Sequence, residues 1–302
     1  MSAFPGRQLA LGAALILAGC APARPPIAPS ALVLAENAGS TLVVVTLDPA
    51  GVGTNSLRVD LQSETGGEVR GSVDVRLERD GRQVATLGLA PPILPVGSPT
   101  LDGAVTIPEA GRYTLHIDLT AGAPRGSVAF DLDLPSPPAP PDLLARVDAA
   151  MNALRFLRER QTLASGVGQY VFSYEYASPG HIHYIFVAPD GTEHETILLD
   201  DYRYDRDVPL PWSSEDLGSP TPWPDFTFSR NAQHAHLIAH ESVDGVAADV
   251  VAFTIPRNPT LHYRLWVGAN DLRARRYVMM ATGHYMRGTY SDFDAPVDIR
   301  PP

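Results

Sequence analysis

Three segments of the chain, residues 57–62, 73–78 and 112–119, alternate strictly between hydrophobic and polar side chains. Successive side chains of a β-strand point to opposite faces, so this pattern predicts strands with one face on a core and the other in water. Residues 41–47, 84–89 and 128–134 predict further strands, and glycine-containing turns separate the segments. So many short strands within about a hundred residues predict a β-sandwich of immunoglobulin-like type over residues 31–134.

Residues 135–141 contain five prolines, which predicts a linker and a domain boundary. Hydrophobic residues then recur at helical spacing over residues 143–157, and Asp142 stands where a helix N-cap is expected. Cations favour the C-terminal end of a helix, and three arginines fall there: Arg155, Arg158 and Arg160.

Beyond the predicted helix, apolar segments predict a series of antiparallel strands: residues 168–176, 181–187, 196–199, 235–241, 248–255, 263–267 and 275–281. Residues 208–226 are rich in proline and tryptophan and predict an irregular segment with a short helix or a flap. One helix followed by many strands indicates a curved sheet around a helix. We therefore predict a mainly β protein, with the sandwich followed by a curved antiparallel sheet around a helix over residues 142–302.

The N-terminus carries one arginine, Arg7, and an apolar run over residues 9–17 that ends before Cys20. The run is far shorter than the roughly 20 residues that cross a bilayer, so it predicts a secretory signal peptide over residues 1–19. The small residues before Cys20 resemble the lipobox of bacterial lipoproteins, which implies cleavage before Cys20 and its lipidation. An ordinary signal peptide with an unrelated cysteine is the alternative. Cys20 is the only cysteine, so no disulfide can form within the chain.

The proline-rich residues 20–30 predict a stiff tether between the lipid and the folded part. We therefore expect a protein of the cell envelope, outside the cytoplasm, held at a membrane by its N-terminal lipid. The formal net charge of −11 opposes binding to phosphate backbones, so no nucleic-acid partner is expected. The chain lacks a G-x-S-x-G elbow, a phosphate-binding loop and a dinucleotide fingerprint, and we expect no enzymatic activity.

The second domain resembles the LolA/LppX group of envelope lipoprotein carriers. The resemblance rests on residues 241–246 (E-x-V-D-G) followed by 250–253, on residues 263–276, and on residues 283–293. At residues 268–271 the turn departs from the pattern of the group. The resemblance covers residues 142–300 and implies a half-barrel whose apolar face, closed by helices, holds acyl chains or other hydrophobic ligands.

The first domain resembles the small β-sandwiches of CopC/CopD-type and YtkA-like envelope proteins. Residues 48–51, 55–59 and 110–113 carry this resemblance, which implies a copper-handling context. The sandwich contains no methionine and a single histidine, His116, so it lacks the soft ligands that a copper site requires.

The strands of the second domain are rich in aromatic residues, which suits a concave, mostly apolar ligand pocket. The alternative is that these side chains simply pack the helix against the sheet. The candidate lining of the pocket is Phe172, Tyr174, Ile182, Tyr184, Phe186, Phe253 and Trp266.

Eight of the nine histidines belong to the second domain, and two pairs have H-x-H spacing. On a strand this spacing places both imidazoles on one face, as zinc and copper sites require. The candidate metal ligands are His234, His236 and His240, and no cofactor other than copper or zinc is expected. The pair His181 and His183 is expected on a solvated face. A second soft-ligand group has core packing as its alternative: Met279, Met280, His284 and Met286.

Three functions remain open at this point. The first is non-catalytic binding or carriage of an acyl or other hydrophobic ligand in the second domain. The second is an accessory role in envelope copper or zinc homeostasis through the histidines. The third is a scaffold in which residues 31–134 dock an envelope protein partner.

Overall fold

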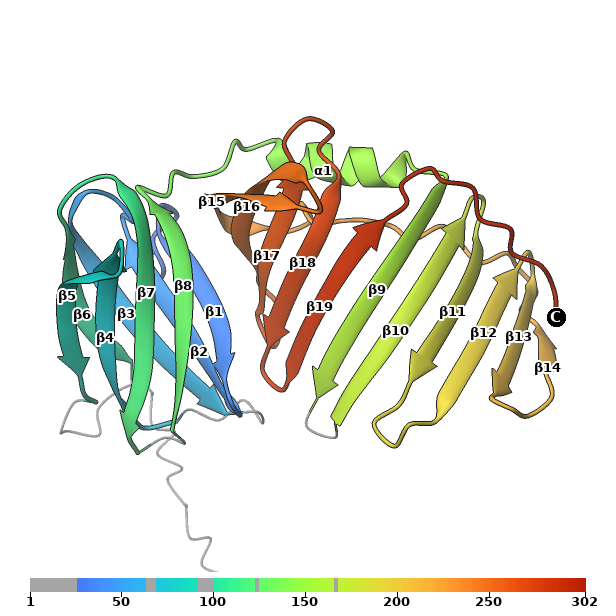
Figure 1. Ribbon diagram of the computed structural model, residues 1–302, viewed down its shortest axis with the longest axis horizontal. Coiled ribbons are helices and arrows are strands. Elements are labelled where there is room, and N and C mark those ends of the chain that lie inside the picture. The colour runs from blue at the N-terminus through green and yellow to red at the C-terminus, as the bar shows by residue number, and fades with distance from the viewer. Residues whose placement is uncertain (1–25, 64–68, 92–99, 123–124, 166–167) are drawn as a thin grey trace, which may run out of the picture.

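The computed structural model describes residues 26–63, 69–91, 100–122, 125–165 and 168–302. The predicted signal peptide, Cys20 and the first part of the tether lie outside these residues. The described part contains one α-helix and nineteen strands, which pair antiparallel in three sheets (Figure 1). The prediction of a mainly β, antiparallel protein is thus confirmed.

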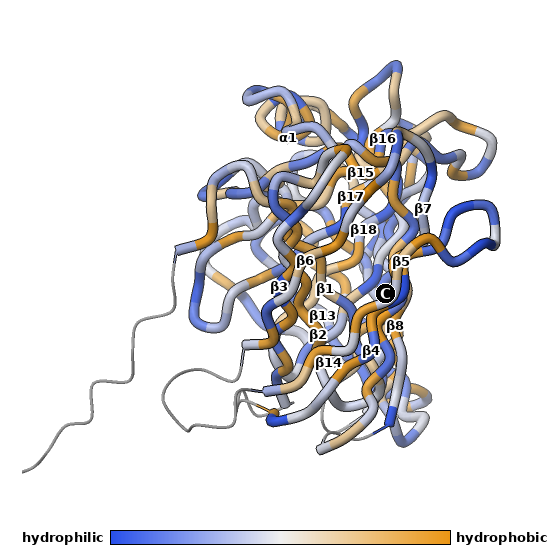
Figure 2. Tube along the Cα trace, turned by 90° about the vertical axis from the view of Figure 1, so that its left-hand side faces the viewer, coloured by the Kyte–Doolittle hydropathy of each residue, from blue (hydrophilic) through white to orange (hydrophobic). Residues whose placement is uncertain are grey.

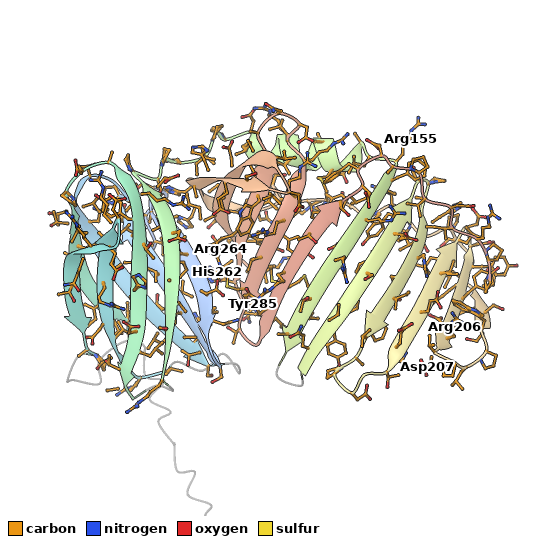
Figure 3. All side chains as sticks on the ribbon, in the orientation of Figure 1. Arg155, Arg206, Asp207, His262, Arg264 and Tyr285 are labelled. Atoms are coloured by element: carbon orange, nitrogen blue, oxygen red, sulfur yellow. The ribbon has the colours of Figure 1, made fainter. Side chains whose placement is uncertain are left out.

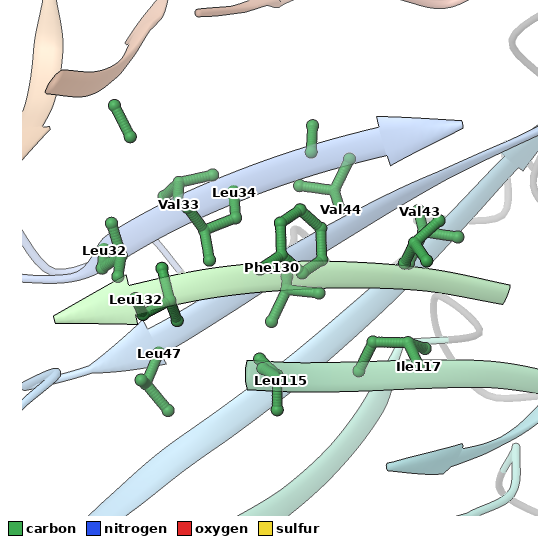
Figure 4. Close-up of a cluster of buried hydrophobic side chains, with 14 of the residues drawn as sticks. Leu32, Val33, Leu34, Val43, Val44, Leu47, Leu115, Ile117, Phe130 and Leu132 are labelled. Carbon is green, nitrogen blue, oxygen red and sulfur yellow. The ribbon is translucent and has the colours of Figure 1, made fainter. Parts of the chain in front are cut away.

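The first half of the chain forms two four-stranded sheets, in the orders β1-β2-β3-β6 and β5-β4-β7-β8. Leu34 and Val43 of the first sheet share one hydrophobic cluster with Leu115 and Phe130 of the second (Figure 4). The alternating segments lie in β3, β4 and β7, and their hydrophobic positions are the buried ones. The strands are β1 (Leu32–Ala38), β2 (Thr41–Asp48), β3 (Gly53–Ser63), β4 (Ser72–Arg79), β5 (Arg82–Leu89), β6 (Leu101–Ile107), β7 (Gly111–Ala121) and β8 (Gly126–Leu134).

The second half forms a single sheet of eleven strands in the order β14-β13-β12-β11-β10-β9-β19-β18-β17-β16-β15. Helix α1 (Leu143–Asn152) lies across one end of this sheet (Figure 1). At ten residues, this described helix is too short to cross a bilayer. The strands are β9 (Phe156–Ser165), β10 (Gly168–Ala177), β11 (His181–Val187), β12 (Glu193–Leu199), β13 (Tyr202–Asp207), β14 (Ser213–Asp216), β15 (Gln233–Val243), β16 (Val246–Ile255), β17 (Leu261–Gly268), β18 (Ala274–Ala281) and β19 (His284–Ser291).

The helix is shorter than its hydrophobic spacing predicts. It ends at Asn152, and Phe156–Ser165 is strand β9, which pairs with β10 on one side and β19 on the other. Leu157 fits the spacing of a helix, but it also fits the alternation of a strand. The segment that contains Leu157 forms a strand because it pairs with two long strands, β10 and β19. Asp142 precedes the helix without a side-chain capping bond.

The eleven-stranded sheet has two faces with different neighbours. On the face that carries α1, called the helix face below, Val147 and Met151 pack in one cluster with Phe253 and Tyr277. The side chains on the other face, called the opposite face, include Val250, Trp266 and Met280, which share a cluster with the sandwich residues. Strand β15 contacts β8, and β1 contacts β15, β16 and β17. The part of the opposite face on β15, β16 and β17 therefore packs against the β1–β8 edge of the sandwich.

The proline-rich linker is attached to the second sheet along its length. The backbone N–H of Leu237 donates to the carbonyl of Pro137 (3.0 Å), and the N–H of Ala139 donates to the carbonyl of Ala235 (2.8 Å). In the view from the sandwich side, hydrophobic stretches run along the strands, while several protruding turns are hydrophilic (Figure 2). The two halves of the chain are thus joined by both the linker and a shared hydrophobic cluster.

Candidate functional site

A group of aromatic side chains lies on the helix face of β10 and β11. We call Tyr170, Phe172, Tyr174, Tyr184 and Phe186 the aromatic strip. Ring centroids are 5.8 Å apart for Phe172 and Tyr174, 5.5 Å for Phe172 and Phe186, and 5.4 Å for Tyr174 and Tyr184. Alternate strand residues share a face, and the register aligns Phe172 with Phe186 and Tyr174 with Tyr184. The strip is therefore a continuous apolar surface two strands wide.

One end of the helix face is covered. Helix α1 covers this end together with part of the segment between β14 and β15. Asp148 of α1 accepts hydrogen bonds from the backbone N–H groups of Phe228 (2.7 Å) and Ser229 (3.0 Å). The Trp223 ring meets Tyr176 edge-on at 6.1 Å. Residues 208–226 were predicted to be irregular, and they hold strand β14 but no helix.

The other end of the strip stays open to solvent. Tyr170, Phe172 and Phe186 are half-buried and lie outside the core cluster beneath α1. The register continues this apolar surface from Tyr170 to Leu163 on β9 and from Leu163 to Met286 on β19. Half-buried aromatic and aliphatic side chains that contact one another can bind an acyl chain or another apolar molecule.

The predicted pocket residues divide into three groups. Phe172, Tyr174, Tyr184 and Phe186 lie together in the aromatic strip. Ile182 and Phe253 share this face but belong to the core, and Phe253 is fully buried against Tyr263 at 5.0 Å.

The prediction for Trp266 is wrong, because its side chain lies on the opposite face, in the cluster shared with the sandwich. Trp266 is aligned with Val250 of β16. Val250 is three residues from Phe253 on the same strand, so the two point to opposite faces, and Trp266 points away from the helix face with Val250.

A buried carboxyl group lies next to the aromatic strip. Glu159 of β9 is aligned with Tyr174 and accepts hydrogen bonds from the hydroxyls of Tyr277 (2.7 Å) and Tyr176 (3.0 Å). Burial raises the pKa of Glu159, although the two hydroxyl donors oppose that change. Burial also raises the pKa of Tyr174 above its ordinary value of 10.0. Burial thus favours the neutral forms of both groups, which suits the apolar character of the covered end of the helix face.

Comparison with known proteins gives a likeness in fold alone. Two solved structures are similar to about half of this chain. The lipoprotein LppX of Mycobacterium tuberculosis aligns at 13% identity and a TM-score of 0.43, over 54% of this chain and 100% of its own. LprF of Mycobacterium bovis aligns at 16% identity and a TM-score of 0.44, over 55% of this chain and 98% of its own. No family model matches the chain, and no curated protein matches it. Its ligand and location therefore have to be argued from its own residues.

The three predicted metal ligands do not share a face. The register of β15 against β16 shifts between Gln233 and His236 and again between Leu237 and Ala239. Each β-bulge adds a residue to one strand and reverses the alternation of its side chains. His236 is consequently aligned with Ala252, on the opposite face, and His240 with Asp249, on the helix face.

Each of these imidazoles also has a local environment of its own. His236 is buried, with Nδ1 2.8 Å from the carbonyl of Ser136, and His240 is exposed, with Nδ1 2.7 Å from Asp249. Burial lowers the pKa of His234. Within the described residues, no three His, Cys, Asp or Glu side chains are grouped to hold a metal ion.

The second H-x-H pair takes part in a row of alternating charges on the opposite face. His183 lies between Glu175 and Glu195, with nitrogen–oxygen distances of 3.4 and 2.9 Å. Arg158 binds Glu175 (2.8 Å), and Arg206 binds Glu195 (2.7 Å). Burial opposes ionisation of both carboxyls, but these donors hold the pKa of each below its ordinary value. The row is an ion-pair network across five strands, β9 to β13.

The sequence reasoning missed two features of the site. It did not find β9, which brings Glu159 into the middle of the helix face. It also did not place Trp223, Phe226 and Phe228 over that face, where they pack against the core beneath α1. Aromatic side chains within the irregular segment were the available signal, because loops that pack on a core retain large apolar residues.

Proposed function

We propose that this chain is a non-catalytic, lipid-anchored protein of the cell envelope that binds a hydrophobic ligand on its aromatic strip. The observation that carries the proposal is the half-exposed end of the strip, where Tyr170, Phe172 and Phe186 contact one another outside the core. A surface of this kind gains free energy when an apolar molecule excludes water from it, at roughly 25 cal/mol per Å² of apolar area. The lipobox-like residues before Cys20 support the anchor.

The test is ligand binding by the chain without residues 1–20, which retains every described residue. After delipidation, the protein is titrated with a fluorescent fatty acid, and the untreated protein is weighed by native mass spectrometry. We expect a bound mass in the lipid range and saturable binding of the probe. Replacing Phe172 and Phe186 together by alanine should weaken binding at least tenfold, since about 1.4 kcal/mol corresponds to a factor of ten.

The matched control is Tyr202→Ala combined with Tyr204→Ala. This stacked pair lies on the same sheet, with ring centroids 6.2 Å apart, but on the opposite face of β13. The control should bind the probe like the unaltered chain. A clean protein mass without probe binding, or equal weakening in both double variants, would reject the proposal.

The copper or zinc function has no grouped ligand set within the described residues to support it. The scaffold function is distinguished by the same experiment, because a scaffold predicts neither bound lipid nor probe binding. The β1–β8 edge of the sandwich is already covered by the second sheet, so a partner of the sandwich would have to use its other surfaces.

A further inference from the structure

A groove of about 650 Å³ lies on the opposite face of the eleven-stranded sheet, away from the aromatic strip. Its lining is drawn from β9, β10, β17, β18 and β19, and four of its side chains are arginines: Arg160, Arg264, Arg276 and Arg287. The volume falls within the range of about 300–1,000 Å³ that is usual for small-molecule sites. In a chain of net charge −11, this concentration of positive charge is unusual.

The strand register places these arginines on neighbouring positions of one face. Arg160, Thr289 and Arg276 are aligned across β9, β19 and β18, and Trp266 continues this row on β17. The next row, two residues along the strands, aligns Thr162, Arg287, Val278 and Arg264. The four arginines lie on four adjacent strands, β9, β19, β18 and β17. Neighbouring strands are about 4.8 Å apart, so the four guanidinium groups project from a small area of the sheet.

Three of the four arginines have no carboxylate partner. Arg264 binds Glu36 of β1, which joins the groove to the sandwich; Arg264 lies in the space between the two halves, near His262 and Tyr285 (Figure 3). Arg160, Arg276 and Arg287 form no ion pair with any described residue. The nearby carboxylate of Glu241 is engaged by the indole N–H of Trp266 at 2.7 Å.

The rest of the same face shows how unusual this is. Between β9 and β13, charges alternate in sign, as in the row from Arg158 through Glu175 and His183 to Glu195. Like charges on adjacent positions of a sheet are destabilising, and opposite charges are favourable. Arg160, Arg276 and Arg287 occupy neighbouring positions of the groove, and none of them has a carboxylate partner among the described residues. This part of the face therefore lacks the anions that pair the positive charges between β9 and β13.

Aromatic rings hold two of the free guanidinium groups in place. Arg276 lies over the ring of Trp266 at 5.0 Å, and Arg287 lies over Tyr285 at 5.3 Å, where one of its terminal nitrogens also donates to the Tyr285 hydroxyl at 3.4 Å. Stacking on a ring leaves the N–H edge of a guanidinium free to donate, and this edge matches the two oxygens of a phosphate group. The hydroxyls of Thr162 and Thr289 add donors between the arginines.

We propose that this groove binds a phosphate group carried by a small molecule or by a lipid headgroup, through Arg160, Arg276 and Arg287. The site is independent of the aromatic strip, because the two lie on opposite faces of one sheet. A hydrophobic ligand on the strip cannot extend into the groove. The chain then has two binding sites, one apolar and one for a phosphate anion.

The experiment uses the chain without residues 1–20 and three probes. Inorganic phosphate and glycerol 3-phosphate are titrated by calorimetry, and vesicles of phosphatidylcholine with or without phosphatidylglycerol are tested by co-sedimentation. Binding of glycerol 3-phosphate or inorganic phosphate assigns a soluble phosphate ligand. Binding confined to vesicles with phosphatidylglycerol assigns a lipid headgroup. Either result supports the proposal if the groove variant below loses it.

The groove variant is Arg160→Gln with Arg276→Gln, and its control is Arg82→Gln with Arg112→Gln. The control removes the same charge from exposed strand positions of the sandwich that have no ion pair with a described residue. We expect at least tenfold weaker binding in the groove variant and unchanged binding in the control. Arg287→Glu, which adds repulsion within the groove, should also abolish binding while the fatty-acid probe still binds the aromatic strip.

Equal weakening in the groove variant and the control would assign the binding to net charge and overturn the proposal. An intact chain that binds none of the three probes would overturn it as well. Neither result bears on the hydrophobic ligand, so the failure of one proposal is distinguishable from the failure of the other.

Discussion

At the scale of residues, the carboxyl group of Glu159 and the imidazole of His262 are buried in the larger sheet, and neither has an oppositely charged partner among the described residues. Glu159, on the helix face, has two tyrosine hydroxyl donors. His262, on the opposite face, is buried with its Nδ1 unpartnered. Burial raises the pKa of the acid and lowers that of the base, so both groups favour their neutral forms.

His262 predicts a loss of stability in mild acid. Burial lowers its pKa from 6.5 to about 4, so the unfolded chain binds a proton at a pH where the folded chain does not. The free energy of unfolding therefore falls as the pH decreases from 6.5 towards 4, by up to about 3 kcal/mol at about 1.4 kcal/mol per pH unit. In His262→Leu this part of the pH dependence should disappear, as measured by urea unfolding at a series of pH values.

The control for His262 is His284→Leu, at an exposed position of the same sheet. It should retain the acid sensitivity of the unaltered chain. If His262→Leu loses stability between pH 6.5 and 4 as steeply as the unaltered chain, another group is responsible for the acid sensitivity.

At the scale of elements, the segment between β14 and β15 is attached to α1. This attachment sets where the covered part of the helix face ends and the open part begins. Asp148 supplies much of this attachment, because its carboxylate accepts from two backbone N–H groups and from the hydroxyl of Ser229 at 2.5 Å. Asn152 adds a second attachment, since it donates to the carbonyl of Phe226 and accepts from the N–H of Phe226.

Replacing Asp148 by alanine should loosen this segment. The N–H groups of Phe228 and Ser229 lose their acceptors, and each such loss in a partly buried site costs about 1–3 kcal/mol. Hydrogen exchange followed by mass spectrometry should show faster exchange over residues 223–232. Asp142→Ala, which removes an exposed carboxylate with no capping bond at the start of the same helix, should leave that exchange unchanged. Unaltered exchange in Asp148→Ala would show that aromatic packing alone holds the segment.

At the scale of the whole molecule, the two halves of the chain share a hydrophobic cluster that contains Val75 and Phe130 of the sandwich as well as Val250 and Met280 of the larger sheet. The hydroxyl of Thr282 also donates to Gln62 of the sandwich at 2.9 Å. A shared core couples the stability of both halves, although the proline-rich linker by itself indicates separate domains.

Met280→Ala tests this coupling. The side chain is 1% exposed, and its truncation in a close-packed core should cost about 2–5 kcal/mol. Hydrogen exchange in β7, which belongs to the sandwich, should then report the same loss of protection as exchange in β17. Unchanged protection of β7 would show that the sandwich unfolds independently of the larger sheet.

Much of the architecture was predictable because it follows from residue patterns within single segments of the chain. Leu57, Val59 and Leu61 alternate with polar residues, and this period alone predicts the strand and its buried face. Residues 42–45, within the predicted strand 41–47, are hydrophobic without alternation and are buried in β2. The strand β1 (Leu32–Ala38), which pairs with it, was not predicted. The four aromatic residues of β10 and β11 that the prediction brought together also share one face, since they follow the same period of two.

The sequence by itself determined the mainly β architecture, the helix after the proline-rich linker and the aromatic strip, because each depends on spacing within one segment of the chain. Only the tertiary structure decided that Trp266 faces the sandwich, that a β-bulge between Leu237 and Ala239 puts His236 and His240 on different faces, and that Arg160 and Arg276 lie in one groove. These outcomes depend on the register between strands that are distant along the chain. A shift of one residue moves every side chain of a strand to the other face, and no local pattern records that register.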